Sequence, residues 1–434
     1  MYEIVIGRSP KDREALGTRG TVLLGKHYVS MGQTTSLSNE IFMDVSRSHV
    51  VFVVGKRGSG KSYSMGVMAE GMASLPPEVR QNISVIILDT MGIYWTMKYP
   101  NRKDEPLLRA WGLHSQALEV QIYTPAGYYQ QYRDKGIPTD FPFSIRPAEL
   151  AASDWALTFG ISTSSPVGVL LERVVHALRE VGEYSIEDII TAIRQDEKTD
   201  QLTRDAAENR FAAARTWGLF SERGTPFSEL MGGGKVTIVD VSCYATIPGA
   251  SGIRALVIGL IAEKLFIERM VARKNEEYQS ISGSLHELRE VEKAKPRLPM
   301  VWLVLDEAHE FLSNKGTTSA TKALLTILRE GREPGISLIL ATQQPGKIHT
   351  DVITQSDIVL AHRLTAKVDV DALGMLLQSY MREGLDKQLA TLPPLTGAGI
   401  IFDDLNERIY PLQIRPRLTW HGGEAPNALA QDKG

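Results

Sequence analysis

The sequence predicts an α/β protein whose core is a mainly parallel β-sheet with helices between its strands. Short apolar runs recur from residue 49 onward, and stretches with helical spacing lie between them. Strands buried on both faces have this continuous apolar character, and strands that alternate with helices pair in parallel. A glycine-rich loop follows the first run directly, as in doubly wound folds. The expected strands are 50–54, 85–88, 236–241, 301–305, 338–340 and 358–360.

The composition is that of a folded globular protein. The chain has 434 residues, 43% of them hydrophobic and 23% charged, which excludes a disordered chain, a collagen-like repeat and a disulfide-rich miniprotein. Its one cysteine, Cys243, has no second cysteine to pair with, which favours a reducing compartment. The net charge of −3 argues against a surface that coats nucleic acid, but it allows a local basic site.

We expect a cytoplasmic protein without a membrane-spanning segment. The first residues lack the basic-then-apolar order of a signal peptide, and charged residues interrupt the longest apolar candidate, 253–272.

The pattern divides the chain into five parts. Before the core, Glu3–Ile6, Thr21–Leu24 and Ile41–Val45 are expected as short strands of a small β-rich module. Within the core, a stretch in which Val167–Val181 has helical spacing indicates a helical insertion between two strands. The predicted parts are a β-rich module (1–48), the first part of the core (49–144), the helical insertion (145–232), the second part of the core (233–416) and a C-terminal tail (417–434).

Residues 55–62 match the phosphate-binding pattern G-x-x-x-x-G-K-[ST]. The strand 50–54 precedes them and a helix-compatible run, 63–72, follows, which is the setting that such a loop requires. A surface turn that contains Lys-Ser by chance is the alternative, and this context disfavours it. The loop and its setting therefore predict nucleotide binding.

Each residue type in this loop has a chemical reason. Glycines let backbone N–H groups turn toward phosphate oxygens, and the start of the following helix adds a favourable dipole. Lys61 is expected to reach the β- and γ-phosphates, and the Ser62 hydroxyl is expected to bind Mg²⁺. The predicted nucleotide-binding residues are Gly55, Lys56, Arg57, Gly58, Ser59, Gly60, Lys61, Ser62 and Tyr63.

The apolar strand 300–305 ends in two carboxylates, Asp306 and Glu307. Asp306 is predicted to hold Mg²⁺ together with Ser62, and Glu307 to orient or deprotonate the attacking water. A strand end with solvated acids is the alternative, and the phosphate loop upstream disfavours it. His309 fits a structural or coupling role better than metal binding, because nothing pairs with it at ligand spacing.

Two further polar residues lie near expected strand ends. Gln343 follows strand 338–340 and is placed to report whether the γ-phosphate is present. Arg332 lies where a helix ends, and an arginine there could stabilise transition-state charge at a neighbouring subunit's nucleotide. A salt bridge or a contact with the helix end is the structural alternative for Arg332. Arg329 and Arg363 are weaker candidates for the same role.

Taken in order, these motifs resemble those of the HerA–FtsK superfamily of ring-forming DNA-pumping ATPases, and within it the HerA-like branch. The likeness runs from about residue 20 to about residue 416. Besides residues 55–62, the matching motifs are Leu88-Asp89-Thr90-Met91-Gly92, Leu305-Asp306-Glu307-Ala308-His309, Arg329-Glu330-Gly331-Arg332 and Ala341-Thr342-Gln343-Gln344-Pro345. One departure is Ile93, which stands where the family's Asp-x-x-Gly-Glu motif has its glutamate.

The resemblance implies a RecA-like P-loop NTPase core, a homohexamer that hydrolyses ATP between subunits, and double-stranded DNA threaded through a central channel. It implies Arg332 as the finger that acts in trans and Gln343 as the sensor. It also implies a separately encoded nuclease or other effector as partner, in DNA end processing (DNA repair) or phage defence.

In such a ring, a duplex would be held mainly through its phosphates. Lys315 and Lys347 are candidate channel cations, although a solvated lysine is the more common reading of either residue. Two other functions stay open: a secretion or conjugation ATPase, and a nucleotide-switched scaffold ring that regulates an effector.

Overall fold

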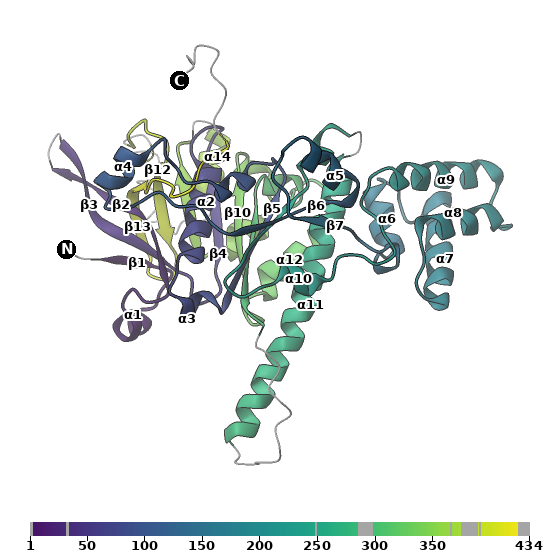
Figure 1. The fold of residues 1–434 in the computed structure, drawn as a ribbon, viewed down its shortest axis with the longest axis horizontal. Coiled ribbons are helices and arrows are strands. Elements are labelled where there is room, and N and C mark those ends of the chain that lie inside the picture. The colour runs from purple at the N-terminus through teal and green to yellow at the C-terminus, as the bar shows by residue number, and fades with distance from the viewer. Residues whose placement is uncertain are drawn as a thin grey trace, which may run out of the picture.

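The computed structural model describes residues 3–31, 34–247, 250–284, 298–364, 367–374, 389 and 392–423. These residues form one thirteen-stranded sheet with helices on both faces (Figure 1). The strand order across the sheet is β1-β3-β2-β13-β12-β11-β4-β10-β9-β5-β8-β6-β7. The strands are β1 (Ile4–Ile6), β2 (Thr21–Met31), β3 (Thr34–Asp44), β4 (Val50–Val54), β5 (Ile83–Asp89), β6 (Val120–Pro125), β7 (Phe141–Phe143), β8 (Val236–Asp240), β9 (Met300–Leu305), β10 (Ile336–Thr342), β11 (Ile358–His362), β12 (Ala398–Asp403) and β13 (Arg408–Ile414).

The half of the sheet from β11 to β7 is parallel, and this confirms the predicted fold class. Its strands are apolar along their whole length because both faces are covered. In β4, Val51 and Val53 join one hydrophobic cluster, and Phe52 and Val54 join the cluster on the other side. Alternate side chains therefore enter two separate cores, as the continuous apolar runs indicated.

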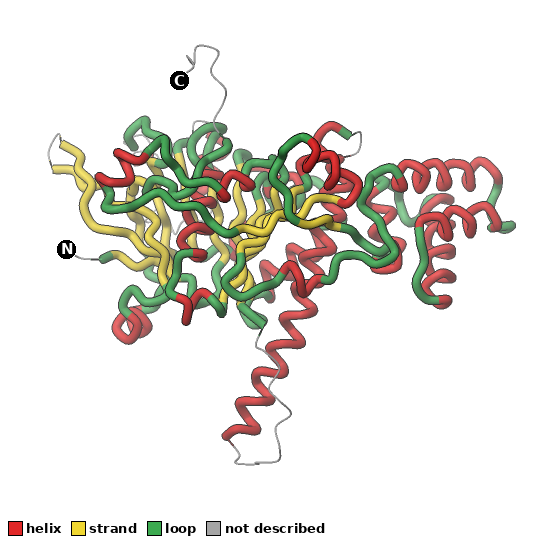
Figure 2. The backbone as a smooth tube through the Cα atoms, in the orientation of Figure 1, coloured by secondary structure: helices red, strands yellow, loops and turns green. Residues whose placement is uncertain are grey.

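The helices are shown as coils in Figure 1 and in red in Figure 2. The α-helices are α1 (Pro10–Leu16), α2 (Lys61–Ala73), α3 (Pro77–Arg80), α4 (Glu105–Ala110), α5 (Ala126–Asp134), α6 (Ala152–Thr158), α7 (Pro166–Val181), α8 (Ile186–Gln195), α9 (Gln201–Arg215), α10 (Phe227–Leu230), α11 (Ala250–Ser284), α12 (Thr321–Glu330), α13 (Thr350–Gln355) and α14 (Lys367–Gly374). Short 3₁₀ helices are η1 (Tyr94–Lys98), η2 (Pro147–Glu149), η3 (Ser242–Thr246), η4 (Ala308–Glu310) and η5 (Pro345–Lys347).

The other half of the sheet is largely antiparallel and includes the N-terminal strands. β2 pairs with β3 and also with β13, whose Leu412 lies opposite His27. The segment expected as a small β-rich module is thus continuous with the central sheet. β2 and β3 also extend beyond the predicted runs 21–24 and 41–45. Of the two partners of β2, β13 lies almost 400 residues away in the sequence, and a local pattern cannot indicate such a pairing.

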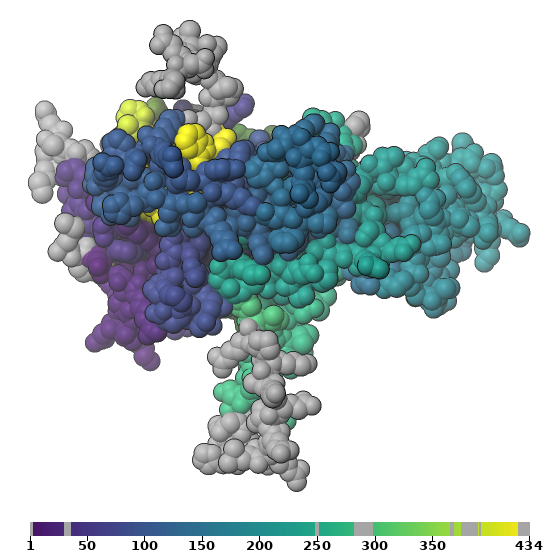
Figure 3. Space-filling view, viewed as in Figure 1, coloured from purple at the N-terminus to yellow at the C-terminus, as the bar shows by residue number. Residues whose placement is uncertain are grey.

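The segment between β7 and β8 is mostly helical and forms a lobe beside the sheet (Figures 1 and 3). Ser165 caps α7, with Pro166 at its first position, and a capping box of Ser185 and Asp188 begins α8. Isoleucines on α8 and Phe211 on α9 fill the interior of this lobe. The long helix α11 starts beside the lobe and extends away from the sheet (Figure 2).

The chain after β13 packs against the core, whereas the prediction began a tail at residue 417. Arg415, Arg417 and Thr419 are buried, and all three hydrogen-bond Glu70 of α2. Backbone hydrogen bonds also hold this segment. The Asn101 N–H donates to the Leu418 carbonyl at 3.0 Å, and the Trp420 N–H donates to the Tyr99 carbonyl at 2.8 Å. The packed part of the chain therefore extends past the predicted boundary.

Among the described residues, no helix combines the length and the apolar character that crossing a bilayer requires.

Candidate active site

The loop between β4 and α2 leaves the first N–H groups of α2 without a side-chain cap. Gly60 occupies the cap position with a φ of 113°, and Gly58 has a φ of 76°, both in the region that favours glycine. A helix start has unpaired N–H donors and a partial positive charge. The loop is therefore built to hold an anion at the start of α2.

Lys61 is the first residue of α2, and its side chain is largely enclosed, with 7% of its surface exposed. Its Nζ lies 3.4 Å from the carbonyl oxygen of Lys56. Burial lowers the pKa of Lys61, and the charges of Asp306 and Glu307 act in the opposite direction. The ammonium group is thus held among groups that do not fully neutralise it, which suits a phosphate ligand.

Ser62 and Asp306, 244 residues apart in sequence, are in direct contact. The Ser62 hydroxyl donates to Oδ2 of Asp306 at 2.6 Å, and the backbone N–H of Glu307 donates to Oδ1 at 2.8 Å. Hydroxyl and carboxylate oxygens are the ligands that Mg²⁺ prefers. Because Ser62 donates its proton to Asp306, the lone pairs of its oxygen remain free, so the pair fits a Mg²⁺ ion.

Glu307 is held in a strained backbone conformation, with a φ of 50°. Burial, and then the charge of Asp306, raises the pKa of Glu307 to about 7. Its Oε2 is buried without a hydrogen bond and lies 3.4 Å from Nδ1 of His309. That nitrogen is instead paired with Thr342 Oγ1 at 3.0 Å. A buried carboxylate with a free oxygen is suited to accept a proton.

The end of β10 lies between the phosphate loop and the two carboxylates, because β10 pairs with β4 on one side and β9 on the other. Gln343, the residue after β10, is half-buried, and its backbone acts to lower the pKa of Glu307. The next residue, Gln344, contacts Nε2 of His309 at 3.1 Å through its amide nitrogen. His309 thus links the ends of β9 and β10.

The three arginine candidates lie in different places. Arg332 is exposed in the turn before β10, at the amino edge of the sheet, whereas the phosphate loop lies at the carboxyl edge. Arg269 supports this turn by donating to the Pro334 carbonyl at 2.7 Å. Arg329 forms an ion pair with Asp351 at 2.5 Å. The exposed Arg363 follows β11 at the loop edge, and its carbonyl accepts from Lys56 N–H at 3.2 Å.

Tyr63, predicted to contact nucleotide, packs toward the C-terminal segment. Its hydroxyl oxygen accepts from the backbone N–H of Arg417 at 2.7 Å, and its ring lies edge-on to His421. Burial raises the pKa of Tyr63 to about 12. In this structure Tyr63 connects the phosphate-loop helix to the end of the folded chain.

Glu70 on α2 anchors the same C-terminal segment. Its carboxylate pairs with Arg417 at 2.8 Å and with Arg415 at 3.2 Å, and it accepts the backbone N–H of Thr419 at 3.1 Å. Burial acts to raise the pKa of Glu70, but the two guanidinium charges outweigh it and lower the pKa. This network holds the helix that carries Lys61 and Ser62.

His362, at the end of β11, is a supporting residue that the sequence analysis missed. Its ring is fully buried behind the loop, where Nε2 lies 2.9 Å from Ser64 Oγ and Nδ1 lies 3.0 Å from the Ala398 carbonyl. Burial lowers its pKa to about 4, so the ring is neutral at neutral pH. Gly397 N–H also donates to the Ser59 carbonyl at 3.2 Å. The contacts with β12 depend on a strand that was not predicted.

Asp89, in the motif that lacks the family's glutamate, hydrogen-bonds the backbone of the turn that follows it. It accepts backbone N–H groups from Met91, Gly92, Ile93 and Tyr94 at 2.7–3.1 Å. Burial and the adjacent Asp240 raise its pKa, and the hydrogen bonds from Tyr94, Gly92 and Met91 act against that rise. Asp89 therefore fixes the turn that leads from β5 into η1.

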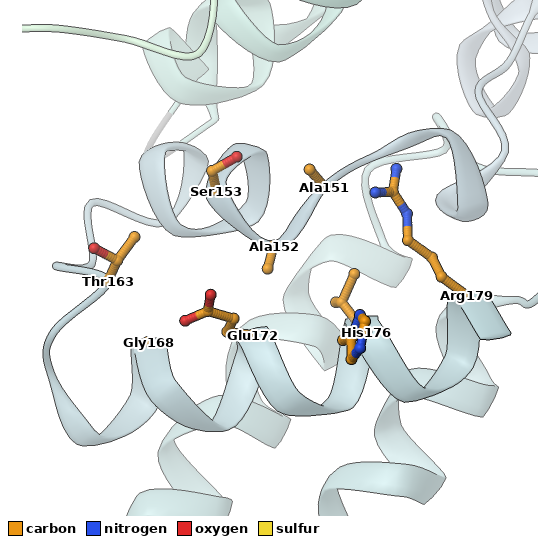
Figure 4. A pocket seen from close by; sticks show the side chains of 9 residues that line it. Ala151, Ala152, Ser153, Thr163, Gly168, Glu172, His176 and Arg179 are labelled. Atoms are coloured by element: carbon orange, nitrogen blue, oxygen red, sulfur yellow. The ribbon is translucent and has the colours of Figure 1, made fainter.

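A separate hollow of about 410 Å³ lies in the helical lobe, between the start of α6 and one side of α7 (Figure 4). Glu172, His176 and Arg179 of α7 line it, together with Ser153 and Thr163. None of the predicted site residues contributes to this hollow.

The strand order and the assembled loop define a P-loop ATPase: the loop strand β4 lies between β11 and β10, and β9 carries the two carboxylates. A family model described as "Helicase HerA, central domain" matches residues 31–247, which is half of the chain. The chain belongs to this family and thus to the HerA–FtsK superfamily of P-loop ATPases.

Two archaeal proteins show the relationship in sequence. The chain is 29% identical over 167 residues to the probable DNA double-strand break repair helicase HerA of Methanocaldococcus jannaschii, a match that covers 37% of this chain and 32% of that protein. It is 28% identical over 112 residues to the DNA double-strand break repair helicase HerA of Pyrococcus furiosus, covering 26% and 19% respectively. The matches thus span a third or less of the relatives' lengths.

Among solved structures, VirB4 of Thermoanaerobacter pseudethanolicus has a TM-score of 0.54 at 12% identity, with 91% of this chain and 96% of that chain covered. At this identity the likeness describes the fold alone.

Proposed function

We propose that this chain is an ATP-hydrolysing ring motor that acts on double-stranded DNA. The observation that carries the proposal is the 2.6 Å contact between Ser62 and Asp306, with the free carboxylate oxygen of Glu307 beside it. That arrangement brings together a phosphate loop, oxygen ligands and a proton acceptor. The archaeal relatives, which are described as DNA double-strand break repair helicases, support DNA as the substrate.

Within one subunit, the N–H groups at the start of α2 and the Lys61 ammonium group bind the phosphates of ATP. Ser62 and Asp306 hold Mg²⁺, whose contribution when bound is to neutralise phosphate charge. Glu307 accepts the proton of the attacking water, because its free oxygen and raised pKa suit a general base. Gln343 reports the state of the γ-phosphate to η5 through its position next to Glu307.

The place of Arg332 supports a ring. β10 has seven residues and separates Arg332 from the loop edge by about 20 Å, which is longer than an arginine side chain. Arg332 can therefore act as a finger only on the nucleotide of a neighbouring chain. Head-to-tail contacts that close give such a ring, and six copies are expected from the family resemblance.

The place of Lys315 and Lys347 supports a DNA-binding surface. Both are exposed, and their loops lie side by side: Asn314 N–H donates to the Lys347 carbonyl at 3.0 Å, and Ser313 and Ile348 form a β-bridge. Both loops follow strands that end at the active site. We assign these lysines to the channel, where they contact DNA phosphates independently of sequence.

The proposed partner is a nuclease or other effector in DNA repair or phage defence, and the proposed location is the cytoplasm.

The decisive experiment measures ATP turnover of the full-length protein with and without linear duplex DNA, at several salt concentrations. Stimulation that falls as salt rises is expected, because phosphate contacts release counterions. Changing both Lys315 and Lys347 to alanine should remove the stimulation and leave basal turnover unchanged. The same double change at Lys11 and Lys322, exposed lysines on α1 and α12, is the matched control. Turnover that duplex DNA never raises would favour the scaffold or secretion-type alternatives.

The ring is tested by mixing two inactive variants, Arg332→Ala and Glu307→Gln. A ring with Arg332 acting in trans recovers activity in mixed assemblies, since some interfaces then carry an intact Arg332 and an intact Glu307. Mass photometry with ATP should show a six-subunit species. An Arg332→Ala protein with normal turnover would refute the finger, and a fully active monomer would refute the ring.

A further inference from the structure

Tyr94 is a buried aromatic residue whose hydroxyl group lies beside the predicted metal ligands. It begins η1, and only 1% of its surface is exposed. Its hydroxyl is buried and completes no hydrogen bond with the described residues. The Ser62 side chain and the charge of Asp306 are among the groups that act on this hydroxyl. A buried phenol normally finds a hydrogen-bond partner, so this one requires an explanation.

The backbone holds Tyr94 firmly in this place. Its N–H donates to Oδ2 of Asp89 at 2.9 Å, and the same carboxylate binds the three preceding N–H groups. Asp89 is itself buried next to Asp240, where an ionised carboxylate is costly. Because Asp89 fixes this turn through four hydrogen bonds, the position of the Tyr94 side chain is restricted. The Tyr94 hydroxyl therefore lies near Ser62 as a consequence of the backbone.

Ser62 and Asp306, which act on this hydroxyl, offer only acceptors to it because their other hydrogen-bonding groups are already used. Ser62 gives its proton to Asp306 Oδ2, and Asp306 Oδ1 accepts the N–H of Glu307. Both residues are then acceptors on the side that remains, whereas Tyr94 brings a donor. A buried hydroxyl without a partner is destabilising, and this cost disappears when a bound oxygen accepts its hydrogen bond. In a Mg²⁺–nucleotide complex, Mg²⁺ keeps several water ligands, which are such oxygens.

We propose that Tyr94 is a positioning residue of the Mg²⁺–nucleotide site, whose hydroxyl donates a hydrogen bond that fixes the oxygen groups around Ser62 and Asp306. The proposal rests on the metal-binding part of the proposed function and is independent of DNA, the ring and Arg332. It also gives the Asp89 motif a purpose in this chain: the carboxylate of Asp89 orients the turn, and the turn delivers Tyr94. Groups that orient metal ligands typically contribute 10–100-fold to metal affinity.

The test uses the full-length Tyr94→Phe protein, which lacks one oxygen atom and keeps the buried ring. Binding of a fluorescent ATP analogue is titrated with Mg²⁺ and is also measured in EDTA. We expect the half-saturating Mg²⁺ concentration to rise roughly 10–100-fold and the affinity in EDTA to stay within about twofold of the original protein. Electron paramagnetic resonance of Mn²⁺ in place of Mg²⁺ should show the same loss of metal affinity, which is a readout that does not need turnover.

Tyr184→Phe is the matched control. Tyr184 is also buried with a hydroxyl that completes no hydrogen bond, but it lies in the helical lobe, just before α8. Its removal should leave the Mg²⁺ requirement unchanged. An unchanged Mg²⁺ requirement in Tyr94→Phe, or an equal loss of affinity in EDTA and Mg²⁺, would overturn the proposal and make Tyr94 a packing residue. A Ser62→Ala protein that keeps its Mg²⁺ requirement would instead refute the metal site of the proposed function.

Discussion

Two groups of charged side chains lie at opposite ends of the same central strands, and they differ in how well they are paired. At the amino edge, His49 lies 2.6 Å from Asp357 and 3.2 Å from Asp44, and Asp44 also pairs with Arg8. At the carboxyl edge, Lys61 has no ion-pair partner among the described residues, and Glu307 has a carboxylate oxygen without a hydrogen bond. β4 connects the two groups, because it begins after His49 and ends at the phosphate loop.

This difference separates residues that stabilise the fold from residues held for a ligand. Buried charges that are paired and hydrogen-bonded contribute to folding, whereas incompletely paired ones cost stability and are kept where a ligand completes them. The strained backbone of Glu307 belongs to the second kind. Charge removal at the carboxyl edge should therefore reduce function and spare stability, and removal at the amino edge should do the reverse.

The largest effect is expected for Lys61→Ala. Without its ammonium group the loop loses the charge that reaches the phosphates, so ATP affinity should fall at least about 100-fold. The free energy of unfolding without nucleotide should be unchanged or slightly higher, since a buried and incompletely paired cation is removed. Nucleotide titration and urea unfolding measure the two quantities. Lys322→Ala, at an exposed lysine on α12, is the control, and a Lys61→Ala protein that unfolds much more easily would contradict the comparison.

Glu307→Gln should separate binding from hydrolysis. The amide keeps the shape of the side chain but cannot accept a proton, so turnover should fall by about 10²–10⁴-fold while ATP binding remains. Steady-state ATPase assays and nucleotide titration provide the readouts. The control is Glu310→Gln, because Glu310 is close by but pairs with Arg254 at 2.9 Å. Normal turnover of Glu307→Gln would remove Glu307 as the proton acceptor.

Elements specified by local sequence were predicted correctly, whereas elements specified by distant contacts were not. The parallel core and the phosphate loop were predictable because each depends on a short run: an apolar strand, glycines, and a helix start. The strands β6, β7, β12 and β13 were not predicted. β13 contains Pro411 and only alternately buried residues, and its place in the sheet depends on pairing with β2 and β12.

The candidate site shows the same limit. Ser62, Asp306 and Glu307 lie in motifs with fixed spacing, and the structure brings them together. Tyr94 and His362 could not be identified as site residues, because an aromatic or histidine side chain in an apolar run is the usual content of a core. Their positions depend on a turn fixed by Asp89 and on the distant strand β12.

Glu70→Gln tests a paired cluster that borders the active site. The amide cannot neutralise Arg415 and Arg417, which would then be buried without a counter-charge, so the free energy of unfolding should fall by about 3–5 kcal/mol. Urea unfolding measures this loss. Glu78→Gln, an exposed glutamate on α3, should have almost no effect. If Glu70→Gln were as stable as the original protein, pairing would not distinguish the stabilising charges from those of the site.

The smallest effect, and the one that depends on pH, is expected at the amino edge. Burial opposes the charged form of His49, but hydrogen bonds to Asp357 and Asp44 outweigh it and raise the pKa to about 9, with Arg8 as the nearby cation. The histidine therefore adds stability that is fully present below its unfolded pKa of 6.5 and is lost as pH rises through about 9. In His49→Gln the pH-dependent part of this stability, about 3 kcal/mol, should be missing near pH 6 and should make no difference above about pH 9.5. Urea unfolding across this range measures it, and His176→Gln, whose exposed side chain lies on α7, is the control. A deficit that grows with pH would mean that His49 is neutral in the folded protein, and the amino-edge cluster would then be no better paired than the active site.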